Sequence, residues 1–226
     1  MLKALIFDVD GTLCETEETH RHAFNRAFAE TGLNWHWTVD DYRRLLRTTG
    51  GKERMRAHRD ACGLLQPDDP AIARLHALKT QHYVTALAKG DLVPRPGVRD
   101  IINEARSCGL ALAIATTTSP ANVEALVRAI WGCDAHAVFD VIAAGDEVIA
   151  KKPAPDVYLL ALQRLGLPAT AAIAFEDSRN GMRSARAAGL RVVVTPGIYT
   201  ADEDFSGADW LVPDLSAFRL ARHISD

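Results

Sequence analysis

Short apolar runs separated by amphipathic stretches make up most of this chain. The first run, Ala4 to Phe7, has no polar position, which is typical of a strand that is buried on both faces. Further runs predict strands at residues 110–115, 138–143, 171–175, 191–194 and 210–212. Helical patterns separate most of these runs. We therefore expect an α/β fold with a doubly wound (Rossmann-like), mostly parallel sheet.

The stretch from residue 15 to about residue 90 shows helical patterns and little else. An apolar stripe runs through residues 23–28 and ends before Gly32. Thr38 and Asp41 have the spacing of a capping box, and further helical patterns follow a glycine-rich break at residues 48–52. We therefore predict an all-helical cap domain inserted into the α/β core. Its range is 15–92, and the core comprises 1–14 and 93–226.

Two carboxylates follow the first predicted strand. In extended backbone, residues i and i+2 point the same way, so Asp8 and Asp10 would face one small volume while Val9 turns away. Carboxylates this close resist joint ionisation, so either a cation holds them or one is protonated. Gly11 permits the tight turn that follows. The pattern favours a chemical site, although an acidic turn that only closes a strand is the alternative.

Polar side chains also follow the second predicted strand. Ligands of open α/β sheets bind outside the carboxyl ends of strands, so these positions are candidate site residues. Thr116, Thr117 and Thr118 come directly after the run that ends at Ala115. Pro120 fits the first turn of a helix, whose N-terminal amides would favour an anion. A polar loop without a ligand is the alternative.

A lysine pair and an acidic pair follow later runs. Lys152 precedes Pro153, and we expect a helix to begin at this proline. A lysine at a helix N-terminus opposes the macrodipole, which indicates an anion nearby. Glu176 and Asp177 follow the run that ends at Phe175. A solvated lysine pair and acids that complement a helix dipole are the alternatives.

Composition narrows the class of protein. The 226 residues are 48% hydrophobic and 24% charged, which is ordinary for a globular chain that buries a full core. A formal net charge of -3 gives no argument for nucleic acid or an anionic membrane as a partner. The dispersed cysteines and histidines show neither CxxC nor HExxH spacing, so a reducing environment without a zinc site fits. We expect a cytoplasmic monomer without a targeting peptide or membrane span.

The four strand-end sites together resemble motifs I to IV of the haloacid dehalogenase superfamily. The DVDGT sequence at 8–12 matches motif I, and Thr116, Lys152 and the acidic pair stand in the order and spacing of the other three. The resemblance implies a phosphatase that works through an aspartyl phosphate. It makes Asp8 the nucleophile and Asp10 the general acid and base.

The same resemblance implies a Mg²⁺ cofactor. It assigns the metal to Asp8, the main-chain carbonyl of Asp10, Asp177 and Glu176. Attack by a carboxylate on a phosphate monoester must overcome anion repulsion, which a hard divalent cation with oxygen ligands relieves. By resemblance, Thr116 and the Thr117 amide hold phosphoryl oxygens. Lys152 neutralises charge on the phosphate and on the nucleophile.

The predicted cap resembles the helical caps of the β-phosphoglucomutase-like branch. More narrowly, it is similar to CbbY-type xylulose-1,5-bisphosphate phosphatases, which implies a Calvin-cycle sugar bisphosphate as the substrate. The most specific signal is GGKER at 50–54, where glycine amides and two basic side chains suit a second phosphate. The substrate-binding residues expected outside the motifs are Glu17, His20, Tyr42, Gly50, Gly51, Lys52, Arg54, His76, Lys79 and Thr118.

Three other functions remain open from the sequence. A β-phosphoglucomutase would use the same chemistry but would return the phosphoryl group to a second sugar position. A phosphatase of sugar monophosphates would not need the basic GGKER run. A sensor that only binds phosphosugars would have no need of the nucleophile and its partners, all of which are intact.

Overall fold

A parallel sheet forms the centre of the computed structural model, which describes residues 1–90 and 92–224. The strands are β1 (Ala4–Phe7), β2 (Ala111–Thr116), β3 (Val141–Ala144), β4 (Ala172–Glu176), β5 (Arg191–Val194) and β6 (Trp210–Leu211). Their order in the sheet is β3-β2-β1-β4-β5-β6, and each pairing is parallel. This confirms the predicted α/β fold. Residue 91 of the predicted cap range and residues 225–226 of the predicted core range lie outside the described residues.

The two faces of the sheet bury different side chains. Along β1, Ala4 and Ile6 pack into the core on one face, whereas Leu5 and Phe7 pack into the core on the other. This alternation follows from the pleat of the strand. Phe7 also stacks on Phe175 of the neighbouring strand, with ring centroids 4.7 Å apart. β1 is thus held in the middle of the sheet by apolar contacts on both sides.

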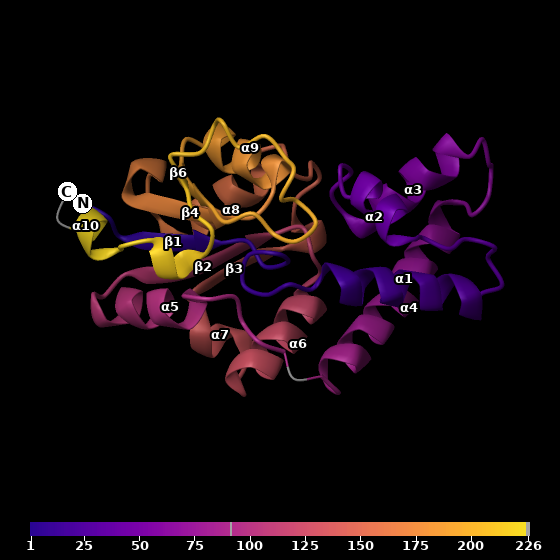
Figure 1. Cartoon of the computed structure of the whole chain (residues 1–226), viewed down its shortest axis with the longest axis horizontal. Coiled ribbons are helices and arrows are strands. Elements are labelled where there is room, and N and C mark those ends of the chain that lie inside the picture. The colour runs from indigo at the N-terminus through magenta and orange to yellow at the C-terminus, as the bar shows by residue number, and fades with distance from the viewer. Residues whose placement is uncertain (91, 225–226) are drawn as a thin grey trace.

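Helices cover both faces of the sheet. α5 (Val98–Ser107), α6 (Pro120–Trp131) and the short α7 (Ala135–Val138) lie on one side, and α8 (Asp156–Leu165) and α9 (Arg179–Ala187) lie on the other (Figure 1). The short α10 (Ala221–Ile224) follows the last strand. Among the described residues, none of the helices combines the length and the apolar character that a membrane span requires.

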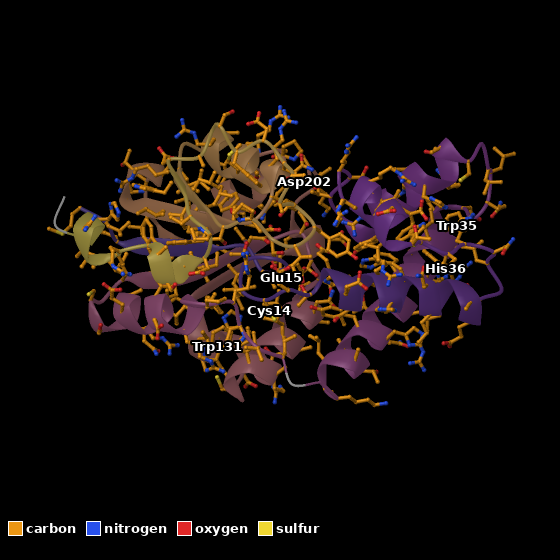
Figure 2. All side chains as sticks on the ribbon, in the orientation of Figure 1. Cys14, Glu15, Trp35, His36, Trp131 and Asp202 are labelled. Carbon is orange, nitrogen blue, oxygen red and sulfur yellow. The ribbon has the colours of Figure 1, made fainter. Side chains whose placement is uncertain are left out.

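Four helices between β1 and α5 form a separate group beside the sheet (Figure 1). They are α1 (Glu17–Glu30), α2 (Val39–Leu45), α3 (Gly51–Ala61) and α4 (Asp69–Leu87), and we call them the helical insertion. The capping box of Thr38 and Asp41 is present at the start of α2. Trp35 and Trp37 pack in the apolar core of the helical insertion, together with Tyr199 from outside it. Figure 2 shows Trp35 within the insertion, and Glu15 where the chain enters it.

Local structure differs from the sequence-based expectation at three places. The strand expected at 138–143 begins only at Val141, because the residues before it form α7. The glycine-rich break at 48–52 is shorter than expected, since α3 already begins at Gly51. Pro153 does not begin a helix. α8 starts at Asp156, so Lys152 lies in a loop rather than at a helix N-terminus.

Candidate active site

Three strand ends bring the predicted motif residues together. β2 and β4 flank β1, and Phe7 lies opposite Ile114 on one side and Phe175 on the other. Asp8 therefore emerges between Thr116, at the end of β2, and Glu176, at the end of β4. Because parallel strands end at the same edge of the sheet, residues far apart in sequence form one site.

Three carboxylates form a buried cluster at this edge. One oxygen each from Asp8, Glu176 and Asp177 lies within 4.8 Å of the others. Burial raises the pKa of Asp8 to about 7, with Lys152 opposing the shift and Glu176 adding to it. Burial, Asp8 and Glu176 raise the pKa of Asp177 well above its ordinary value. An all-oxygen set of crowded, buried acids fits a hard divalent cation, which would relieve this repulsion.

A buried lysine joins two of these acids. The Lys152 ammonium lies 2.6 Å from Asp8 Oδ1 and 2.6 Å from Glu176 Oε1. Burial favours its neutral form, but the two carboxylates outweigh burial and raise the pKa of Lys152. Tyr158 also donates to Glu176 Oε1, at 2.5 Å, whereas Glu176 Oε2 is buried without a protein partner. Lys152 is thus a fixed positive charge beside the expected nucleophile.

Asp10 is held by residues at the start of the helical insertion. Thr16 donates to Asp10 Oδ1 at 2.5 Å, and His20 Nε2 lies 2.9 Å from the same oxygen. Burial alone would raise the pKa of Asp10, but His20 and Thr16 outweigh burial and lower it. On its other side, His20 Nδ1 lies 2.5 Å from the buried Lys79 ammonium. Asp10 is therefore a hydrogen-bonded, ionised carboxylate in this arrangement.

The threonines lie between β2 and α6. Thr116 is buried, and its Oγ1 accepts a hydrogen bond from the Thr118 amide at 3.2 Å. Ser119 caps α6 as the N-terminal residue that precedes Pro120, as expected from the position of this proline. Asn122 donates to Thr118 Oγ1 at 2.9 Å, while its own Oδ1 is buried without a partner. Hydroxyl and amide groups suited to an anion thus line this wall.

A cavity of about 90 Å³ joins the sheet edge to the helical insertion. The predicted residues that line it are Asp8, Asp10, Glu17, His20, Gly50, Gly51, Arg54, His76, Lys79, Thr116, Thr117, Thr118, Lys152 and Asp177. Three other predicted residues, Tyr42, Lys52 and Glu176, are not among its lining residues. Tyr42 and Glu176 are buried directly behind it and hydrogen-bond to lining residues.

At the end of the cavity formed by the helical insertion, the acidic residue Glu17 lies among several basic side chains. Tyr42 donates to Glu17 Oε2 at 3.0 Å and receives a hydrogen bond from Arg54 at 2.7 Å. Burial lowers the pKa of Lys79 to about 7. Burial, with the charges of Lys79 and Lys52, lowers the pKa of His76 to about 3. An anion bound at this end would favour the protonated forms of Lys79 and His76.

Arg54 lines the cavity, but the Lys52 side chain does not. Its ammonium lies 2.5 Å from Asp146 Oδ2, in the turn after β3, and so forms an ion pair between the helical insertion and the core. Thr49, close by, donates to the carbonyl of Lys152. The N-terminal part of α3 therefore touches the core as well as lining the cavity.

Sequence reasoning missed several lining residues, namely Phe24, Leu46, Thr49, Asn122, Ser178, Asn180, Thr200 and Glu203. Thr200 and Glu203 follow β5, so the search of strand ends would have found them if it had been extended to the run at 191–194. Asn122 lies in the first turn of α6, next to the threonines. Ser178 and Asn180 follow the acidic pair at the end of β4, so the same rule points to them, and Thr49 adjoins the glycine pair at 50–51. Phe24 and Leu46 carry no local signal.

Comparison with known proteins identifies the family of the chain. The family model of haloacid dehalogenase-like hydrolases matches residues 2–189, and the chain belongs to this family. Protein CbbY of Rhodobacter capsulatus is 63% identical over 216 residues, which span 96% of this chain and 95% of that protein. The chain is therefore an enzyme, a phosphatase of the haloacid dehalogenase type.

Solved structures agree with the fold. A CbbY variant from Rhodobacter sphaeroides, in complex with xylulose-1,5-bisphosphate, is 51% identical, has a TM-score of 0.91 and is matched over 96% of each chain. A β-phosphoglucomutase from Clostridium difficile has a TM-score of 0.83 over 100% of this chain and 96% of its own. Its identity is 18%, so this second likeness concerns the fold alone.

Proposed function

We propose that this enzyme hydrolyses xylulose-1,5-bisphosphate to xylulose 5-phosphate and inorganic phosphate in the cytoplasm, which would remove a sugar bisphosphate that inhibits Rubisco in the Calvin cycle. The observation that carries the proposal is a cavity with two anion-binding ends. One end holds Asp8, Thr116 and Lys152, and the other holds Arg54 and Lys79. The complex of the CbbY relative with xylulose-1,5-bisphosphate supports it.

Mg²⁺ is the cofactor that the acidic cluster fits best. Asp8, Asp177 and the main-chain carbonyl of Asp10 would hold it, with Glu176 as a ligand or as a support for one. When bound, the cation would neutralise charge on the phosphoryl group and on the nucleophile. Asp177 is free of a lysine partner among the described ion pairs, which leaves its carboxylate available to a metal.

Side chains of the protein would then catalyse two half-reactions. In the first, a carboxylate oxygen of Asp8 bonds to phosphorus and the bond from phosphorus to the sugar oxygen breaks. Asp10, which is ionised in the free site, would take up a proton when substrate binds and give it to that oxygen. In the second, water attacks phosphorus, the bond to Asp8 breaks, and Asp10 takes the proton from water. Thr116, Thr117 and Lys152 hold the phosphoryl oxygens throughout.

The helical insertion would act as a cap domain, with residues 15–92 as its range. Glu17, His20 and Tyr42 would bind sugar hydroxyl groups. The phosphate that is not cleaved would lie near Gly50 and Gly51. Basic groups of the insertion that line the cavity would bind it, and these are Arg54, His76 and Lys79, whereas Lys52 is paired with Asp146 on the core in this arrangement. Arg54 is best placed of these, because it lines the cavity and its guanidinium is already fixed by Tyr42.

Phosphate release from a panel of mono- and bisphosphorylated sugars tests this function. Removing a charge-assisted contact typically costs about 1.5 to 3 kcal/mol, so we expect roughly a tenfold to hundredfold preference for the bisphosphate. A mutase would convert a sugar phosphate without net release of phosphate. A monophosphate phosphatase would show no preference, and a sensor would bind the sugars without turnover. Each of these results would contradict the proposal.

A further inference from the structure

The loop after β5, residues 195–200, is fixed to both connections between the core and the helical insertion. Arg95, in the second connection, donates to the carbonyls of Thr195 and Pro196 at 2.7 Å each. Glu15, in the first connection, accepts from the Ile198 amide at 3.3 Å and lies 3.3 Å from Arg95. Figure 2 shows Glu15 between the sheet and the insertion. We call residues 195–200 the β5 loop.

One residue of the β5 loop holds a member of the acidic cluster. Thr200 Oγ1 donates to the main-chain carbonyl of Asp177 at 2.7 Å and lies 3.3 Å from Asp177 Oδ2. The Gly197 amide donates to the same hydroxyl at 2.9 Å, so its hydrogen-bond direction is fixed. Thr200 is buried and lines the cavity. A hydroxyl held in this way restricts where the Asp177 side chain can lie.

The side chain of the preceding residue, Tyr199, packs in the helical insertion instead. The Tyr199 ring is buried in the apolar core of the insertion and meets Tyr42 edge to face, with centroids 5.8 Å apart. Its hydroxyl donates to Glu18 on α1, and the Arg43 guanidinium lies 5.6 Å from the ring centroid. A residue of the α/β core thus completes the packing of the insertion.

We propose that Tyr199 and Thr200 couple the position of the cap to the position of Asp177. The two residues are adjacent and the loop is fixed at its start, so a displacement of the Tyr199 backbone away from the insertion would move Thr200 as well. Both are positioning residues, since they act through Asp177. The proposal rests on the proposed function, in which Asp177 binds Mg²⁺. It requires that Mg²⁺ affinity depend on Tyr199, whose side chain is hydrogen-bonded to Glu18 rather than to a member of the acidic cluster.

Calorimetric titration of the full chain with Mg²⁺, without substrate, tests the coupling. We expect Thr200→Val to raise the Kd for Mg²⁺ about tenfold, while Thr200→Ser, which keeps the hydroxyl, stays within about twofold of wild type. Tyr199→Ala should raise the Kd about threefold to tenfold, although Tyr199 contacts no carboxylate of the cluster. Tyr199→Phe keeps the buried ring and should remain near wild type.

Trp35→Ala is the matched control for loss of packing. Trp35 packs on Phe28 and His58 within the insertion, and none of the ring contacts or hydrogen bonds among the described residues joins it to the β5 loop. The Trp35→Ala substitution should lower Tm as Tyr199→Ala does, yet leave the Kd for Mg²⁺ within about twofold of wild type. An unchanged Kd in Thr200→Val or in Tyr199→Ala would overturn the coupling, as would equal weakening by Trp35→Ala.

The wild-type protein separates this inference from the proposed function. A wild type that binds Mg²⁺ but releases no phosphate from sugar bisphosphates would contradict the function and leave the coupling to be judged on the variants. A wild type without Mg²⁺ binding would contradict both.

Discussion

At the scale of single residues, the buried end of the site holds more negative than positive charge. Lys152 supplies one positive charge against the carboxylates of Asp8, Glu176 and Asp177. Burial disfavours the charged forms of Asp8 and Asp177, and repulsion by the neighbouring carboxylates adds to this, so the pKa values of both groups rise. Asp10 differs, because hydrogen bonds from Thr16 and His20 stabilise its charge and lower its pKa.

Mg²⁺ should stabilise the protein more at high pH than at low pH. The folded-state pKa of Asp8 is about 7, above its ordinary value of 3.8, so between these values the folded state holds a proton that the unfolded state releases. The stability of the metal-free protein should therefore fall as pH rises through this window. Metal binding needs deprotonated carboxylates, so the rise in Tm on adding Mg²⁺ should be larger above pH 7 than below it. Thermal unfolding at several pH values measures this, and a rise independent of pH would contradict it.

Substitution of the two motif I aspartates should separate their roles. Asp8→Asn should abolish turnover and keep the fold, since an amide neither attacks phosphorus nor adds to the buried charge. Asp10→Asn should lower turnover about a hundredfold or more through loss of acid and base catalysis. With a good leaving group it should still accumulate an aspartyl phosphate, because the second half-reaction is blocked. Mass spectrometry should place the added mass on Asp8, and modification of another residue would contradict the assignment.

At the scale of elements, the N-terminal part of α3 supplies residues both to the cavity and to the contact between the insertion and the core. Gly50 has φ +88°, a conformation that favours glycine, and the helix begins at the next residue. Residues two apart on a helix point about 200° apart around its axis. Arg54 therefore faces the cavity, whereas Lys52 reaches Asp146 on the core. The same turn can hold a substrate anion and fasten the insertion to the core.

Lys52→Ala should lower hydrolysis of a sugar bisphosphate and of an aryl phosphate by the same small factor. The ion pair with Asp146 is partly exposed and is worth about 1 kcal/mol or less, which is less than about fivefold in rate if it favours closure. Asp146→Ala should have the same effect, and the double variant should be no worse than either one. A selective loss of bisphosphate hydrolysis in Lys52→Ala would show instead that this lysine binds the second phosphate.

At the scale of the whole molecule, the insertion is seated on the carboxyl edge of the sheet (Figure 1). The contacts that join it to the core include Lys52 with Asp146, Asn180 with the carbonyl of Arg47, and Tyr199 with Glu18. Apolar side chains join the two parts as well, because Ala23, Tyr83 and Leu87 of the insertion pack in the same buried cluster as Leu13 and Val123 of the core. The polar contacts hold the insertion over the cavity in this arrangement, and we expect them to break when the enzyme opens.

Small-angle scattering should detect opening of the insertion in the free enzyme. We expect the radius of gyration to be larger without ligands than with Mg²⁺ and inorganic phosphate, because phosphate would bridge residues of the core and of the insertion. Tyr199→Ala should weaken this compaction, while Trp35→Ala should retain it. Identical scattering with and without ligands would indicate a site that is closed before substrate binds.

The sequence by itself determined the features that depend on neighbouring residues. β1 spans the same residues, Ala4–Phe7, as the apolar run that predicted it, and the capping box of Thr38 and Asp41 is present. Asp8 and Asp10 both line the cavity while Val9 is buried, as the strand period required. Backbone periodicity and capping are local, so they can be read from a short stretch of chain.

Only the tertiary structure decided which distant groups meet. Lys152 was expected at a helix start, but its position is set by Asp8 and Glu176, which come from two other strand ends. The contact of Lys52 with Asp146 and the contact of Tyr199 with the insertion had no signal in the sequence. The physical reason is that side-chain electrostatics and packing act through space. Which side chains share a buried site depends on how the insertion sits on the sheet, and no local pattern encodes that placement.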